Sequence, residues 1–162
     1  MIATKKVAYL APNESEQLPT PAGFFSVKLD ADQTDGAYAI LVSTVPSQAG
    51  PPPLHSHPFG ESFWVLRGTF EFSAVTANGL ETLVLHDGGL LHVPSNVPHT
   101  FKNVGEETGE LLVIASPVLV DFLREIAALG PFKGPEDMVR AAPVMRKYQV
   151  VPVNSTDERR VS

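Results

Sequence analysis

Hydrophobic and polar residues alternate over short stretches through the middle of the chain, a pattern typical of β-strands with one buried face. Turn residues separate these stretches, and strands are predicted at 24–29, 38–45, 61–66, 70–75, 81–85, 90–93, 99–103 and 111–115. Asn78-Gly79 predicts a tight hairpin between the strands at 70–75 and 81–85. Many short strands between turns indicate an all-β fold, either an antiparallel sandwich or a barrel.

The strand that begins at Glu61 has the clearest alternation. Phe63 and Val65 fall on one side of it, and Trp64 and Leu66 fall on the other. We assign the first pair to the interior, together with the other core candidates Phe70, Phe72, Leu91, Val93 and Phe101. Trp64 and Leu66 would then face outward, where a second sheet or a second subunit would cover them. We therefore expect a homodimer whose subunits pack sheet against sheet.

Both ends of the chain differ from its middle. Residues 1–23 contain three prolines and predict an extended arm with one short strand at 7–10, and a turn-rich loop is expected at 30–36. After residue 116, apolar residues recur at helical spacing up to Gly130, at Val118, Phe122, Leu123, Ile126 and Leu129. A shorter helix is predicted at 135–142, with one more turn through 148. The predicted organisation is an arm (1–23), a barrel (24–116) and C-terminal helices with a tail (117–162).

The composition limits the possible functions. The 162 residues suffice for one sizeable core, and a net charge of −6 argues against nucleic-acid or anionic-membrane partners, which need a basic footprint. The chain has no cysteine, so any metal must be bound through nitrogen and oxygen atoms. The N-terminus lacks the apolar segment of a secretory signal, and no apolar run approaches the ~18 residues of a membrane span. We expect a soluble, cytoplasmic protein.

Potential metal ligands concentrate between residues 50 and 68. His55 and His57 are two apart, so on an extended chain both imidazoles point to the same side. Glu61 has the same parity, and the proline and glycine between it and the histidines would let the backbone bend its carboxylate back toward them. His99 follows the rigid loop 94–98 and is the candidate for a fourth ligand.

Three imidazoles and one carboxylate suit one divalent transition metal per chain: Fe, Mn, Ni, Co, Cu or Zn. A six-coordinate metal with four protein ligands would keep positions open for a substrate and for dioxygen or water. A cluster held together by hydrogen bonds alone is the alternative for these four residues. His86 is expected in an exposed turn, and His92 is expected to pack on a strand without a role in the site.

The spacing of these residues resembles the two motifs of the cupin superfamily. The first runs as Gly50…His55-x-His57-x3-Glu61-x6-Gly68, and the second as Gly88-x5-Pro94-x-Asn96-x2-His99-x3-Asn103. The resemblance implies a double-stranded β-helix, or jelly roll, with His55, His57, Glu61 and His99 binding a metal inside the barrel. Two positions depart from the pattern. Gly50 lies one residue closer to His55 than usual, and Asn96 replaces a glycine, although asparagine tolerates the left-handed conformation that the turn needs.

The whole chain further resembles quercetinase-like single-domain bacterial cupins, through Pro-Pro-x-His-x-His, the strand Glu-x-Phe-x-Val-Leu-x-Gly and a helical C-terminal segment. In quercetinase the metal binds the hydroxyl oxygen of a flavonol, the motif glutamate takes its proton, and dioxygen opens the heterocycle. This resemblance implies a metal-dependent dioxygenase for a flavonol-like or diketone substrate, with Glu61 as catalytic base. The cavity candidates include no Lys or Arg, which argues against a phosphorylated substrate. A non-oxidative isomerase, lyase or hydrolase and a non-catalytic small-ligand-binding protein are the alternatives.

Overall fold

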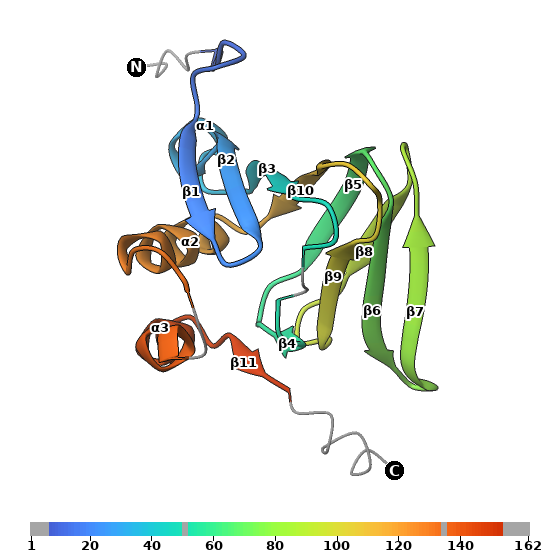
Figure 1. Cartoon of the computed structure of the whole chain (residues 1–162). Coiled ribbons are helices and arrows are strands. Elements are labelled where there is room, and N and C mark those ends of the chain that lie inside the picture. The colour runs from blue at the N-terminus through green and yellow to red at the C-terminus, as the bar shows by residue number, and fades with distance from the viewer. Residues whose placement is uncertain (1–6, 50–51, 134–135, 154–162) are drawn as a thin grey trace.

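The computed structural model describes residues 7–49, 52–133 and 136–153 and contains two antiparallel β-sheets flanked by C-terminal helices (Figure 1). The larger sheet has the strand order β1-β2-β3-β10-β5-β8, and the smaller has the order β11-β4-β9-β6-β7. The chain is therefore mostly β, as the turn-separated strands predicted, and its two antiparallel sheets form the jelly roll that the resemblance to cupins implied.

The larger sheet consists of β1 (Glu16–Thr20), β2 (Gly23–Leu29), β3 (Ala39–Val45), β10 (Gly109–Ala115), β5 (Glu61–Arg67) and β8 (Leu90–Val93). In β5 the side chains alternate as predicted: Phe63 and Val65 are buried, whereas Trp64 and Leu66 are 50% and 43% exposed. The β5 register places Glu61 opposite Ala115 of β10, at one end of the sheet.

The smaller sheet consists of β11 (Val151–Pro152), β4 (His55–Ser56), β9 (His99–Asn103), β6 (Phe70–Thr76) and β7 (Gly79–Leu85). The hairpin predicted at Asn78-Gly79 joins β6 to β7. His55 of β4 lies directly opposite His99 of β9, so main-chain pairing brings together two histidines that are 44 positions apart in the sequence.

The interior between the sheets is filled by aromatic and branched side chains. The core candidates are all buried except Leu91, which is partly buried against the same cluster. Asn103 is fully buried, and its side chain donates to the backbone oxygens of Val45, Pro46 and Glu107 and accepts from the amide of Gly105. The amide group therefore joins the end of β3 and the loop after it to the loop between β9 and β10, a structural role for this motif residue.

Helices α2 (Val118–Ala128) and α3 (Glu136–Lys147) lie beside β1 and β2, across the molecule from β6 and β7 (Figure 1). Arg124 fixes α2 to the sheet, because its guanidinium donates to Glu16 on β1 and forms an ion pair of 2.8 Å with Asp30. Glu125 fixes α2 to the end of α3, where it contacts Lys147 and accepts a hydrogen bond of 2.7 Å from the Tyr148 hydroxyl. Arg124 thus ties α2 to the barrel, and Glu125 ties the two helices to each other.

Three predictions about the chain ends are corrected. No strand forms at 7–10, where Val7 is 96% exposed and has no strand beside it; the first described strand is β1. The expected loop at 30–36 contains the one-turn helix α1 (Ala31–Thr34), which Asp30 caps. Helix α3 continues through Pro143 to Lys147 instead of ending near residue 142, because buried Ala141 and Met145 pack on both sides of the proline.

Other details agree with the sequence. Asn96 has a φ of 63°, the left-handed conformation expected where the motif has glycine. Helix α2 matches the helical spacing after residue 116, and Pro135, predicted to begin the next helix, lies outside the described residues, as does Gly50. Within the three described ranges, no helix is both long enough and apolar enough to cross a bilayer.

Candidate metal centre

Three histidines converge inside the barrel. His55 comes from β4, His57 from the loop that follows it, and His99 from the start of β9. One ring nitrogen from each lies within 4.8 Å of the other two, a spacing that allows one ion to contact all three. His57 and His99 are 4% and 3% exposed, so this cluster is shielded from solvent.

A backbone carbonyl orients each of these rings. The Nδ1 atoms lie 2.7 Å from the oxygen of Pro53 for His55, 2.8 Å from that of Phe59 for His57, and 2.9 Å from that of Val97 for His99. A carbonyl can only accept, so each Nδ1 carries a proton, and each Nε2 is the atom that a metal would bind in place of any proton there. Metal-binding histidines are characteristically fixed in this way.

Glu61 lies against two of the three rings. Its Oε2 is 3.3 Å from Nε2 of His99 and 3.5 Å from Nε2 of His57, and the residue is 6% exposed. The contact with His57 does not have hydrogen-bond geometry, so this Nε2 is buried without a hydrogen-bond partner in the described chain. A buried nitrogen of this kind costs stability unless it is satisfied, and a cation would satisfy it.

The electrostatics of the metal-free cluster favour an ionised carboxylate among imidazoles. Burial alone would raise the pKa of Glu61, but contacts with His57 and His99 outweigh it and lower this pKa to about 2. Burial, assisted by the charge of His99, lowers the pKa of His55 to about 4. Burial also opposes the charged form of His99, but the bond to Glu61 raises its pKa overall. Three nitrogen donors and one carboxylate form a donor set that fits a divalent transition metal.

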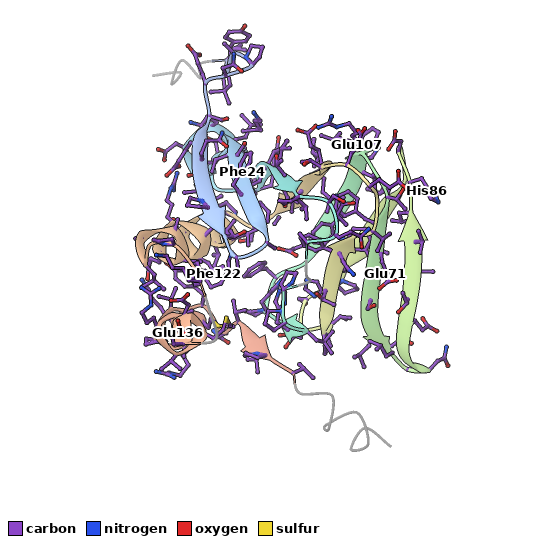
Figure 2. All side chains as sticks on the ribbon, in the orientation of Figure 1. Phe24, Glu71, His86, Glu107, Phe122 and Glu136 are labelled. Carbon is purple, nitrogen blue, oxygen red and sulfur yellow. The ribbon has the colours of Figure 1, made fainter. Side chains whose placement is uncertain are left out.

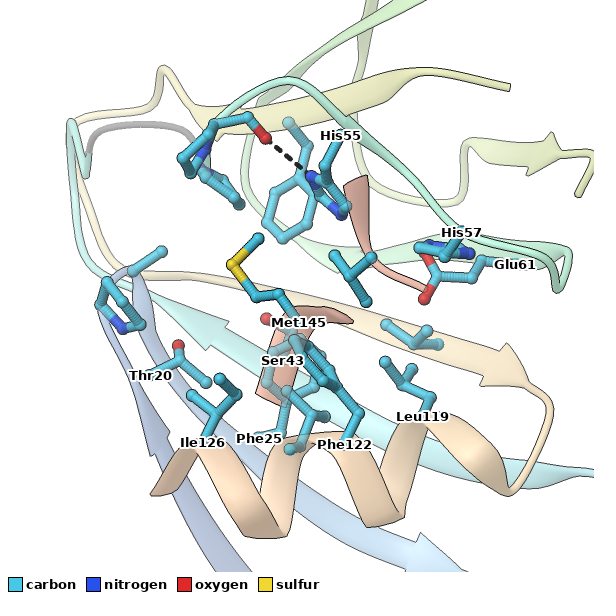
Figure 3. Close-up of a pocket in the computed structure, with 18 of the residues that line it drawn as sticks. Thr20, Phe25, Ser43, His55, His57, Glu61, Leu119, Phe122, Ile126 and Met145 are labelled. Atoms are coloured by element: carbon cyan, nitrogen blue, oxygen red, sulfur yellow. Dashed lines mark hydrogen bonds and ion pairs between the residues drawn. The ribbon is translucent and has the colours of Figure 1, made fainter. Parts of the chain in front are cut away.

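A cavity of about 390 Å³ extends from these histidines to the C-terminal helices (Figure 3). Its walls are apolar and come from the barrel, from β2 and from both helices; they include Phe25, Phe63, Phe101, Phe122, Ile126 and Met145. No Lys or Arg is among the described residues that line it. Figure 2 shows Phe122 projecting from α2 into the space between the helix and the sheets. The volume suits a small organic molecule.

The other candidates from the sequence lie outside the cavity. His92 is exposed, and its Nδ1 is 2.9 Å from the Ser62 hydroxyl. His86 is exposed in the turn after β7, at the outer edge of the molecule (Figure 2). Arg67, at the end of β5, also points to solvent and lies 3.7 Å from Glu110. The structure therefore brings together the four residues of the two motifs and excludes these three.

Much of the cavity wall was not predicted from the sequence. The apolar residues after 116 predicted a helix, but Phe122 and Ile126 also line the cavity, as do Met138 and Met145 of α3. Helical spacing cannot distinguish a side chain that fills a core from one that borders an empty space. Ser43 was not predicted either, although it is the one polar residue at the alternate positions of β3 that are buried.

Comparison with known proteins supports this description. Residues 41–115 match the family described as "Cupin domain". An uncharacterised protein of Streptomyces coelicolor is 26% identical over 104 residues, which is 64% of this chain and 90% of that protein. All four motif residues lie within 41–115, whereas most of the helical part of the cavity lies beyond residue 115.

Solved structures of oxalate decarboxylase share the fold. The enzyme from Bacillus subtilis at pH 4.6 superposes with a TM-score of 0.56 at 18% identity, over 64% of this chain and 27% of its own. Another oxalate decarboxylase structure gives 0.56 at 21% identity, over 64% and 28%. The chain thus spans little more than a quarter of these relatives, and at such identities the likeness concerns the fold alone.

Proposed function

Residues 41–115 of this chain form a cupin domain, and from this premise we propose that the protein is a metal-dependent dioxygenase for an enolisable aromatic, flavonol-like or diketone substrate. His55, His57, Glu61 and His99 are the proposed ligands of one divalent transition metal. One observation carries the proposal: the four residues line an apolar cavity that has no lysine or arginine among its described lining residues.

The absence of a cationic side chain from the described lining separates this site from one for oxalate. A small dianion loses its hydration shell when it binds, so charged hydrogen-bond donors must replace the lost water molecules. Arginine is the usual residue that binds a carboxylate. An aromatic molecule of low charge instead gains free energy by burying its rings against phenylalanine and methionine. The walls therefore favour a neutral aromatic substrate, even though the solved structures with this fold are oxalate decarboxylases.

Glu61 has two proposed tasks. Its carboxylate contributes an oxygen ligand, and it accepts the proton of the enol hydroxyl when the substrate binds. In the metal-free site, His57 and His99 hold the pKa of this carboxyl at about 2 despite its burial. A metal bound at the Nε2 atoms would take the place of the proton through which His99 contacts Glu61, and the carboxylate would then accept the substrate proton instead. A bound metal supplies Lewis acidity toward the substrate oxygen and mediates electron transfer to dioxygen.

Oxygen-electrode measurements test this proposal. The full chain, loaded in turn with Fe, Mn, Co, Ni, Cu or Zn, is mixed with a panel of flavonols and β-diketones, and dioxygen uptake is expected with at least one redox-active metal. The Glu61→Gln variant should lose the uptake. The absence of uptake with every metal and substrate would refute the dioxygenase, and turnover of a substrate by the zinc form without dioxygen would identify a non-oxidative enzyme.

We also propose that the protein is a homodimer. The outer face of the larger sheet exposes a continuous apolar group across β8, β5 and β10, formed by Leu90, Trp64, Leu66 and Ile114. Exposed apolar surface of this kind typically marks an interface. Multi-angle light scattering should give twice the mass of the chain for the wild type and a lower mass for Trp64→Lys, and a monomeric wild type would contradict the proposal.

A further inference from the structure

Ser43 interrupts the apolar inner face of β3. Burial alternates along this strand, and Ala39, Leu41 and Val45 share the inward side with Ser43. Ser43 is 3% exposed and lines the cavity. A hydroxyl at the centre of a hydrophobic wall is expensive to bury, so its presence there requires a physical reason.

The Ser43 hydroxyl makes no hydrogen bond to any residue in the described ranges. Its neighbours differ in this respect. The hydroxyl of Thr20, which also lines the cavity, donates to the backbone oxygen of Gly23, and the buried Ser26 donates to Gln17 at 2.9 Å. Buried polar groups without a partner are rare and destabilise the protein, whereas one that faces a cavity can be satisfied by a ligand.

Ser43 lies well away from the proposed metal ligands. Glu61 pairs with Ala115, and Ala115 pairs with Ala39, so these three residues are level across the sheet. Ser43 is four residues further along β3 than Ala39, which corresponds to about 13 Å of strand. Figure 3 shows Ser43 beside Phe25 and Phe122, on the side of the cavity next to α2 and apart from His57 and Glu61.

We propose that Ser43 forms a second, hydrogen-bonding subsite at the end of the cavity remote from the histidines. The two ends of the cavity define the class of ligand. It is an elongated, mainly aromatic molecule with chelating oxygens at one end and a hydroxyl or carbonyl group at the other. This inference rests on the proposed function for the chelating end only. The hydroxyl of Ser43 fixes which way round the molecule lies, while the rings between the two ends contact Phe25 and Phe122.

Binding of two flavonols to the full chain tests the subsite. The probes are 3-hydroxyflavone and 3,4′-dihydroxyflavone, which share the chelating group and differ by one hydroxyl on the remote ring. Zinc is the metal for this experiment because it has no redox chemistry, so both probes bind without being consumed. Dissociation constants are measured for the wild type, Ser43→Ala, Ser43→Thr, which keeps a hydroxyl, and Ser26→Ala, which removes a buried hydroxyl outside the cavity.

The wild type should bind 3,4′-dihydroxyflavone about tenfold more tightly than 3-hydroxyflavone, the ratio for one hydrogen bond. Ser43→Ala should bring the two affinities to within about twofold of each other without weakening 3-hydroxyflavone, since only the remote hydroxyl loses its partner. Ser43→Thr and Ser26→Ala should keep the preference. The same preference in Ser43→Ala as in the wild type, or no binding of either probe, would overturn the subsite.

The subsite and the proposed function can fail separately. A Ser43-dependent preference in the zinc form, combined with no dioxygen uptake by any metal form, would remove the dioxygenase and retain the subsite. Dioxygen uptake, combined with the same binding preference in Ser43→Ala as in the wild type, would retain the dioxygenase and remove the subsite.

Discussion

Replacing Glu61 by glutamine should weaken metal binding by at least about 100-fold. The two imidazoles beside the carboxylate lower its pKa from 4.5 to about 2, although its burial opposes this. That net change corresponds to about 3 kcal/mol of favourable interaction between the ionised carboxylate and the imidazoles. A divalent ion bound among these rings would interact with the carboxylate at least as strongly, so about 3 kcal/mol, or about 100-fold in affinity, is a lower estimate for the loss.

Thermal unfolding in the presence of metal measures this loss. At a zinc concentration 100 times the wild-type dissociation constant, binding stabilises the folded protein by about 2.7 kcal/mol, which raises the midpoint by roughly 5–11 °C for a chain of this size. A 100-fold weaker site gains only about 0.4 kcal/mol, or roughly 1–2 °C. Competition with a chelator gives the two dissociation constants independently.

Glu110→Gln is the matched control for this experiment. It makes the same chemical change on β10, at a carboxylate that lies 3.7 Å from Arg67 on the outside of the barrel. Its response to zinc should equal that of the wild type. The reasoning fails if Glu61→Gln binds zinc within about threefold of the wild type, because the carboxylate would then contribute little of the estimated interaction.

Three further predictions concern ligand identity, pH and packing. His57→Ala should lower zinc affinity by at least about 100-fold, whereas His92→Ala, on the outer face, should stay within about threefold; equal effects in a chelator competition would contradict the site. In metal-free protein, burial lowers the pKa of His55 from 6.5 to about 4. Its contribution to stability is therefore complete above pH 6.5 and lost as the pH falls toward about 4. Urea unfolding of His55→Gln should show a weaker acid dependence over this window, and an unchanged one would refute the assignment. Gly109→Ala should cost about 1–3 kcal/mol in the same assay, because its Cβ would lie 2.7 Å from the Phe70 ring; a neutral result would show that the ring can move.

The site was more predictable than its surroundings because its determinants are local. The spacing of His55, His57 and Glu61 reflects strand parity and one bend, both of which are visible within seven residues. His99 could be predicted as the fourth ligand because a rigid loop precedes it and because its motif resembles that of a known family. The carbonyls that orient the three rings come from residues two positions away in the chain, so the same short segments that carry the ligands also fix their tautomers.

Features that depend on distant contacts escaped prediction. Residues 7–10 have the composition of a strand but pair with none of the described strands, while β1 contains Pro19 and is tolerated because it lies at the edge of its sheet. Helix α3 continues through Pro143 because the residues on either side of this proline pack against α2, a contact that no local sequence pattern encodes. Arg124 could not be placed either, because its partners Glu16 and Asp30 are about a hundred residues away.

The two ends of the cavity differ in the same way. One lies within the segment that matches the family, and the other is built largely by residues outside it. The match to the cupin family ends at residue 115 and contains the metal ligands, so the similarity to that family covers the metal end of the cavity. The opposite end is built largely by α2 and α3, together with Phe25 of β2, all outside the match. A substrate that reaches from the histidines to these elements would contact residues that lie outside the matched segment. Selectivity should therefore change when Phe122 or Met145 is replaced, while zinc affinity stays the same, and a parallel loss of both would mean that the two ends are not separate.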